Sequence, residues 1–272
     1  MAEVAELSAS DKAFLAPYLP PGSELDGHKD AAGQAHPASS SIKDSTLPFV
    51  TLTYASSLDG MISLAPGLRT TLSRPETKSM THYLRLHHDA ILVGVGTAIP
   101  DDPSLNCRYP GASFISQPRP VILDPRQRWD VKSSKLTQLV ARGKGKVPWL
   151  IHVESGQASR DADEPGRERL YVEAEQGLAS IAWPTILRTL KQKGINSVMI
   201  EGGATIIATL LTMPELVDSV IVTVAPTWLG QGGVSIAPGA KTTEDGRVNA
   251  ATLQNTTWRQ FGQDAVLCGR MG

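Results

Sequence analysis

Short apolar runs alternate with amphipathic stretches along the chain from residue 48 onward. The runs are rich in valine and isoleucine and are bounded by turn residues, which is typical of buried strands in a parallel sheet. They lie at residues 49–57, 90–96, 120–124, 148–153, 197–203 and 219–226. This alternation of strands with helical stretches predicts an α/β fold.

The amphipathic stretches carry the signals of helix ends. Ser73 and Glu76 have the spacing of a capping box, which predicts a helix that continues to about His88. A proline at the start and a glycine at the end predict a second helix over residues 184–194. A third helix is expected over residues 204–211, directly after a pair of glycines.

The two ends of the chain differ in pattern. Residues 257–271 predict two antiparallel strands around a turn, so the sheet should finish with an antiparallel C-terminal hairpin. Residues 1–47 are rich in small and charged residues, and we expect a disordered N-terminal extension there. A short docking turn at residues 11–19 is the alternative within it. One folded domain is then expected over residues 48–272, with a solvated loop at residues 155–169.

Composition excludes several classes of function. The chain has 26 basic and 27 acidic residues and a formal net charge of -1, so no global attraction to nucleic acid or to an anionic membrane is expected. Two cysteines are too few for an all-cysteine zinc site, and we expect no metal. No run of about 18 apolar residues is present that would span a membrane. The first 47 residues contain no arginine and no hydrophobic region, which argues against import or secretion and favours a cytoplasmic location.

The chemistry is expected where strands end and helices begin, because ligands gather at that edge of an α/β sheet. Gly202 and Gly203 precede the helix that begins at Ala204, so a phosphate group can approach free backbone amides there. Close packing of the helix on the strand would explain the same glycines. Glu201 ends an apolar strand, and since an unpaired buried carboxylate is costly, it should pair with a cation or face a ligand.

A second junction runs from Gly94 through Thr97 to an acidic pair before a proline. It lacks the third glycine of a dinucleotide fingerprint, because Ile99 stands at that position. Asp101 and Asp102 are either turn residues or an acid pair.

Two arginines lie on either side of this glycine-rich strand. Arg85 falls on the helix predicted to begin near residue 73, and Arg108 follows the acidic loop. Each alone is as well explained by a surface salt bridge, but together they suit a phosphate group, which guanidinium groups bind bidentately.

Taken in chain order, these motifs resemble one family. They lie at residues 57–60, 94–108, 119–124, 201–205 and 217–230. Over about residues 48–269 the chain resembles the riboflavin-pathway reductases, which convert a ribosylamino-pyrimidine 5′-phosphate to its ribitylamino form. The resemblance implies a dihydrofolate-reductase-like fold with a mixed sheet flanked by helices, NADPH as the hydride donor and a homodimer.

The resemblance also implies roles for single residues. It implies cofactor contacts at Thr97, Asp101, Gly202, Gly203, Ala204 and Thr205. It implies contacts with a small phosphorylated pyrimidine substrate at Arg85, Leu105, Arg108 and Glu201. Asp59 and Glu201 are the candidate catalytic carboxylates, because a carboxylate near an imine stabilises its positive character and relays a proton. Arg126 or Arg128 is the candidate for recognition of the 2′-phosphate of NADPH.

The choice of substrate follows from what the chain lacks. Bacterial relatives are often fused to a zinc deaminase, and this chain lacks the Pro-Cys-x-x-Cys half of that signature. It resembles the free-standing fungal and archaeal reductases, so we expect 2,5-diamino-6-ribosylamino-4(3H)-pyrimidinone 5′-phosphate as the substrate. A dihydrofolate or other pterin reductase on the same fold is one alternative, and a non-catalytic NADP-binding sensor is the other.

Overall fold

The computed structural model describes residues 4–22, 46–153, 168–173, 182–239, 241–242 and 248–272. Residues 23–45 of the predicted extension, and most of the loop predicted at residues 155–169, lie outside the described residues.

Nine strands form one mixed sheet in the order β12-β13-β8-β1-β7-β3-β4-β5-β6. Their bounds are β1 Phe49–Ser56, β3 Ala90–Gly94, β4 Arg119–Leu123, β5 Trp149–Val153, β6 Glu168–Val172, β7 Ser197–Gly202, β8 Ser219–Val224, β12 Leu253–Phe261 and β13 Asp264–Met271. The seven strands from β8 to β6 are parallel, and β13 pairs antiparallel with both β8 and β12. The predicted fold class and its C-terminal hairpin are therefore confirmed.

The described residues also form six helices and several short elements. The helices are α1 Ala9–Leu15, α2 Pro75–Leu86, α3 Val95–Asp101, α4 Lys135–Ala141, α5 Trp183–Gln192 and α6 Ala204–Leu210. Two 3-10 turns cover Ala16–Tyr18 and Pro214–Leu216. Two small ribbons pair β2 (Met61–Ser63) with β9 (Val234–Ser235) and β10 (Lys241–Thr242) with β11 (Val248–Asn249). The sequence pattern predicted the six strands from β1 to β8 that carry apolar runs, but it missed β6, α3 and α4.

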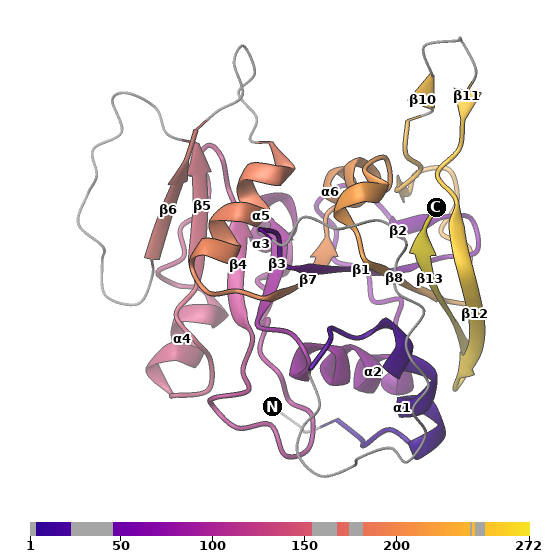
Figure 1. Cartoon of the computed structure of the whole chain (residues 1–272), viewed down its shortest axis with the longest axis horizontal. Coiled ribbons are helices and arrows are strands. Elements are labelled where there is room, and N and C mark those ends of the chain that lie inside the picture. The colour runs from indigo at the N-terminus through magenta and orange to yellow at the C-terminus, as the bar shows by residue number, and fades with distance from the viewer. Residues whose placement is uncertain (1–3, 23–45, 154–167, 174–181, 240, 243–247) are drawn as a thin grey trace.

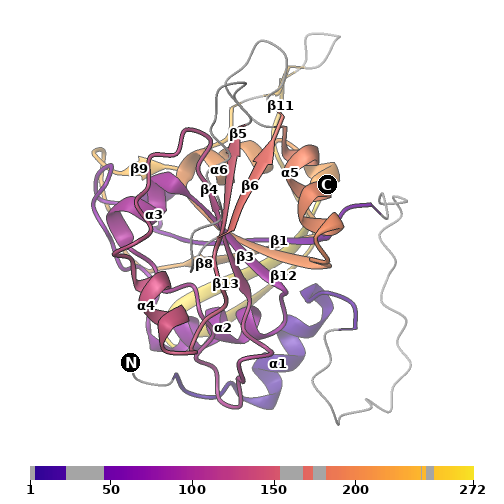
Figure 2. The ribbon, with the colours of Figure 1, turned by 90° about the vertical axis from the view of Figure 1, so that its left-hand side faces the viewer.

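The helices cover both faces of the sheet. Figure 1 shows α5 and α6 above the strands and α2 with α1 below them, and Figure 2 shows the same layers from the side. Ala90 and Leu92 of β3 pack with α5 and α6, whereas Ile91 and Val93 pack with α3 and α4. Because β3 is buried on both faces, its sequence is apolar throughout, as expected of a central parallel strand.

The start of α2 differs from the predicted capping box. The residue before the helix is Arg74, whose backbone N–H donates to the Thr77 hydroxyl at 3.0 Å and to the Asp264 carboxylate at 3.0 Å. The prediction that Ser73 and Glu76 cap this helix is therefore wrong. Asp264 is completely buried and comes from β13, so a distant residue provides the partner that local spacing had assigned to Glu76.

The N-terminal residues 4–22 pack against the domain, so the prediction of a disordered extension over residues 1–47 is wrong for this segment. The Ser8 hydroxyl accepts from the Asp11 backbone at 3.1 Å and begins α1. Leu15 is fully buried and Tyr18 is 5% exposed, among side chains of α2, β8 and β13. The buried residues of this segment, such as Leu15 and Tyr18, do not follow a regular apolar periodicity, so the sequence pattern did not predict α1. Within the described ranges, every helix is too short or too polar to cross a bilayer.

Candidate functional site

The site centres on a bulge at the end of β7. Leu92 of β3 pairs with Ile200, but its neighbour Val93 pairs with Gly202, so Glu201 is an extra residue in the ladder. Bulges bend a strand and redirect a side chain, and they are common beside active sites. The bulge places the Glu201 carboxylate toward α2, where Arg85 lies.

Arg85 and Glu201 form a bidentate ion pair. The Arg85 Nε donates to Glu201 Oε1 at 2.9 Å, and Nη2 donates to Oε2 at 2.8 Å. The side chains are only 12% and 18% exposed. A third group, Nη1, donates to the backbone oxygen of Asn106 at 3.0 Å. The expectation that Glu201 meets a cation is confirmed, and the pair ties α2, β7 and the loop after residue 105 together.

Arg108 lies beside this pair and contacts His82 of α2. The Arg108 backbone N–H donates to His82 Nδ1 at 3.1 Å, and its Nη2 lies 2.9 Å from Nε2. Burial lowers the pKa of His82 to about 3, with further lowering by Arg85 and Arg108. The imidazole is therefore uncharged at neutral pH, so it packs between two arginines without adding positive charge.

Two glycines directly follow Glu201 and lead into α6. Gly202 and Gly203 have φ angles of 128° and 101°, which only glycine adopts readily. A Cβ on Gly203 would lie 3.4 Å from the Thr97 hydroxyl, and one on Gly202 would lie 3.2 Å from the Ile207 side chain. Thr97 therefore lies close to Gly203, which directly precedes Ala204, the first residue of α6. That these residues contact the cofactor stays a prediction.

The residues at the end of α3 and in the loop after it, Asp101, Asp102 and Leu105, have different environments. Asp102 ends α3 with a φ of 40° and accepts from the Lys135 backbone at 3.0 Å, so it is a cap residue. Burial raises the pKa of Asp101. Leu105, expected in the wall of the substrate pocket, packs its side chain into the hydrophobic cluster of β3, β4 and α3. Leu105 as a whole is only 1% exposed, so the expectation that it contacts the substrate stays a prediction.

Asp59 holds a loop at the end of β1. Its carboxylate accepts from the Ser57 hydroxyl, from the Leu229 backbone at 3.1 Å and from the Gly230 backbone at 2.7 Å. These hydrogen bonds lower its pKa to about 2, so Asp59 is ionised at any physiological pH. It joins residues 57–61 to residues 229–230, whereas Glu201 pairs with Arg85 of α2.

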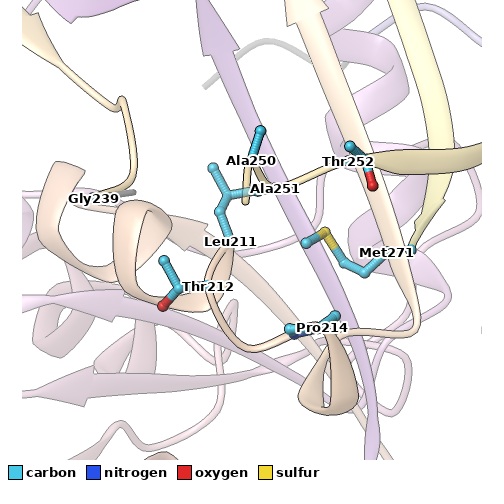
Figure 3. Close-up of a pocket in the computed structure, with 9 residues that line it drawn as sticks. Leu211, Thr212, Pro214, Gly239, Ala250, Ala251, Thr252 and Met271 are labelled. Atoms are coloured by element: carbon cyan, nitrogen blue, oxygen red, sulfur yellow. The ribbon is translucent and has the colours of Figure 1, made fainter. Parts of the chain in front are cut away.

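Two cavities differ in their chemistry. One of about 450 Å³, drawn in Figure 3, opens beyond the far end of α6 between Leu211 and Met271. None of the described residues that line it is charged, so it does not suit a phosphorylated ligand. The other, of about 340 Å³, lies along the loop that begins at Asn106 and is lined by Arg108, Arg142 and Lys144. The basic cavity is linked to the Arg85–Glu201 pair through Asn106, which lines the cavity and accepts a hydrogen bond from Arg85.

Sequence analysis missed two contributors to this cluster. His82 stands three positions before Arg85 on α2, a spacing that places both side chains on one helix face, and this signal was available. The Asn106 carbonyl oxygen carries no sequence signal, because any residue would provide it. Arg126 and Arg128, proposed for cofactor selection, are both exposed in the turn after β4.

The sheet and the site define an α/β protein with a cluster of two arginines around Glu201, next to a pair of glycines that precedes α6. The chain belongs to the RibD C-terminal domain family, which it matches over residues 48–267. The predicted family is therefore confirmed.

Similar proteins cover nearly the whole chain. The 2,5-diamino-6-ribosylamino-4(3H)-pyrimidinone 5′-phosphate reductase of Eremothecium gossypii is 40% identical over 95% of this chain and 95% of its own length. The protein of that name from Debaryomyces hansenii is 40% identical over 84% of this chain and 91% of its own length. The structure of riboflavin biosynthesis reductase Rib7 from Saccharomyces cerevisiae superposes with a TM-score of 0.74 at 32% identity, covering 97% of this chain and 100% of that one.

Proposed function

We propose that this chain is a reductase of riboflavin biosynthesis, which converts 2,5-diamino-6-ribosylamino-4(3H)-pyrimidinone 5′-phosphate to its ribitylamino form with NADPH. The observation that carries the proposal is the bulge at the end of β7. It turns the arginine-paired carboxylate of Glu201 toward α2 and leads through Gly202 and Gly203 directly into α6. A phosphorylated substrate and a dinucleotide can therefore be held next to each other. Two relatives that carry the name of this reductase, each 40% identical to the chain, support the same activity.

The substrate side of the site comprises His82, Arg85, Arg108 and Glu201. A guanidinium carries five N–H groups, and Arg85 donates three of them to Glu201 and Asn106. Two remain for a ligand, while Arg108 lies against an uncharged imidazole. We therefore assign the substrate phosphate to Arg108 together with the remaining N–H groups of Arg85, which also orients Glu201.

The cofactor side comprises Thr97, Asp101, Gly202, Gly203 and the first turn of α6. The space that a Cβ on Gly203 would fill lies 3.4 Å from the Thr97 hydroxyl, so the residues present fit a pyrophosphate group close to the backbone. Ala204 and Thr205 would offer their amides to it. When bound, the nicotinamide supplies a hydride.

The protein's part in the reaction is to align the substrate with the hydride donor and to stabilise the charge of the imine. The C1′–O4′ bond of the sugar opens, O4′ takes a proton, and the resulting imine carbon C1′ accepts the hydride. The proton that O4′ takes comes from water. Glu201, held in place by two hydrogen bonds from Arg85, stabilises the positive charge of the imine.

Asp59 has a different task from Glu201. A carboxyl group with a pKa of about 2 does not donate a proton near neutral pH. Asp59 therefore contributes a permanent negative charge at the end of β1 and fixes the loop at residues 229–230.

The test is oxidation of NADPH by the purified full-length chain, followed by absorbance, with three substrates offered separately. We expect turnover with the diamino substrate, slower turnover with its deaminated analogue and none with dihydrofolate. Preference for dihydrofolate would replace the proposal with a pterin reductase, and no turnover with any of the three would refute a reductase. Assembly into a homodimer stays a prediction, which sedimentation velocity would check.

A further inference from the structure

We propose that the N-terminal residues 4–22 are a positioning element of the substrate side, which fix Arg108 through a hydrogen bond to Tyr109. The inference rests on the proposed function, because it takes Arg108 as the residue that holds the substrate phosphate. The segment lies outside residues 48–267, the part of the chain that matches the family. It therefore adds to the site something that the family match does not describe.

One end of the segment is anchored beneath the sheet. Leu15 is completely buried beside Met80 and Leu84 of α2. The Ser219 hydroxyl of β8 donates to the Tyr18 backbone oxygen at 2.9 Å, in a buried position. Figure 1 and Figure 2 both show α1 lying along α2. The anchor fixes the segment against the helix that carries His82 and Arg85.

The middle of the segment is held by charge. Asp11 of α1 accepts from Arg259 Nε of β12 at 2.7 Å, and the Ser10 hydroxyl accepts from Nη2 of the same arginine at 2.8 Å. These bonds set the direction in which residues 4–8 leave the helix.

The other end of the segment reaches the substrate loop. The Leu7 backbone N–H donates to the Tyr109 hydroxyl at 2.8 Å, in a buried position. Tyr109 is 5% exposed, and its ring centroid lies 5.2 Å from that of Tyr83 on α2. Because Tyr109 directly follows Arg108, the segment controls the residue next to the proposed phosphate ligand.

The loop is thereby held from two directions. From α2, Arg85 binds the Asn106 backbone oxygen and His82 binds the Arg108 backbone N–H. From the N-terminal segment, Leu7 binds Tyr109. Loss of the third bond leaves a buried N–H group without its acceptor, which is costly, so the segment and the loop are expected to separate locally. Arg108 then loses its fixed position while the cofactor side is untouched.

The experiment removes the bond from each partner in turn. Tyr109→Phe deletes the acceptor, and Leu7→Pro deletes the donor. Leu7→Ala keeps the donor and serves as the matched control for Leu7→Pro. Tyr171→Phe, a buried hydroxyl on the edge strand β6, serves as the matched control for Tyr109→Phe. The readouts are kcat, KM for the diamino substrate and KM for NADPH, with folding checked by thermal melting.

We expect Tyr109→Phe and Leu7→Pro each to raise the substrate KM by about fivefold or more, with kcat and the NADPH KM near those of the wild type. The double variant should be no worse than either single one, because both remove the same bond. An unchanged KM in Tyr109→Phe, or effects that simply add in the double variant, would overturn the inference. If the wild-type chain itself fails to turn over the substrate, the proposed function falls and this inference falls with it.

Discussion

The site has a proposed substrate side and a proposed cofactor side, and the two differ in which parts of the chain form them. The substrate side consists of long charged side chains from α2, β7 and the loop after α3, held by bonds such as the 2.8 Å contact of Arg85 with Glu201. The cofactor side consists of backbone, with Gly202 and Gly203 in conformations that exclude larger residues. A site made of charged side chains should lose activity when a charge is removed, and a site made of backbone should lose affinity when a Cβ is added.

Glu201→Gln is expected to have the largest effect. It leaves the mostly buried Arg85 without its counter-charge and removes the carboxylate from the reacting centre. We expect kcat/KM to fall by about 100-fold or more, with Arg85→Ala acting alike, because positioning is lost. NADPH affinity, measured by fluorescence titration, should stay near that of the wild type.

Glu168→Gln is the matched control for this variant. Glu168 also pairs with a cation, Lys193, at 3.0 Å, but it lies on the edge strand β6. Its activity should equal that of the wild type. Near wild-type rates in both Glu201→Gln and Arg85→Ala would refute the placement of the substrate side.

Gly203→Ala should weaken binding at the proposed cofactor side. Position 203 has a φ of 101°, which costs a non-glycine residue about 1–3 kcal/mol, and the new Cβ would occupy the space beside Thr97. We expect the Kd for NADPH to rise about tenfold, since about 1.4 kcal/mol corresponds to that factor. Gly239→Ala is the control, because a Cβ there meets nothing within 4 Å. Unchanged NADPH binding in Gly203→Ala would show that the glycines serve only close packing.

The preference for NADPH over NADH tests a further part of the proposed cofactor side. Arg126 and Arg128 are exposed after β4 and are proposed to contact the 2′-phosphate of NADPH. Replacing each with alanine should lower the preference for NADPH over NADH by about fivefold, as expected for one exposed ionic contact. The ratio of kcat/KM for the two cofactors measures it, and an unchanged ratio in both variants would remove this assignment.

The last prediction concerns stability in acid, and it depends on His82. Its pKa is about 3 in the folded protein against 6.5 for a free imidazole, so below pH 6.5 the unfolded chain binds a proton that the folded chain does not. Stability is therefore lost as pH falls from 6.5 toward 3. Urea unfolding at a series of pH values should show that His82→Gln reduces the slope by up to about 1.4 kcal/mol per pH unit. Identical slopes in the two proteins would contradict an uncharged His82.

The two sides also differ in how far the sequence predicts them. The glycines before α6 and the strand that precedes them are neighbours in the chain, so local pattern was sufficient to place them. The pairing of Arg85 with Glu201 joins residues 116 positions apart and was expected only as a charge needing some partner. At the start of α2, Thr77 and the distant Asp264 both accept from the Arg74 backbone in place of Glu76. Leu15 anchors a segment expected to be disordered, and its partners also lie far away in the sequence.

The most direct measurement of the central claim follows the hydrogen itself. The wild-type chain is incubated with the diamino substrate and with NADPH that carries deuterium at both C4 positions of the nicotinamide, and the product is analysed by mass spectrometry and NMR. The account predicts a ribitylamino product with one deuterium at C1′. A ribitylamino product without deuterium, or no such product, would contradict it.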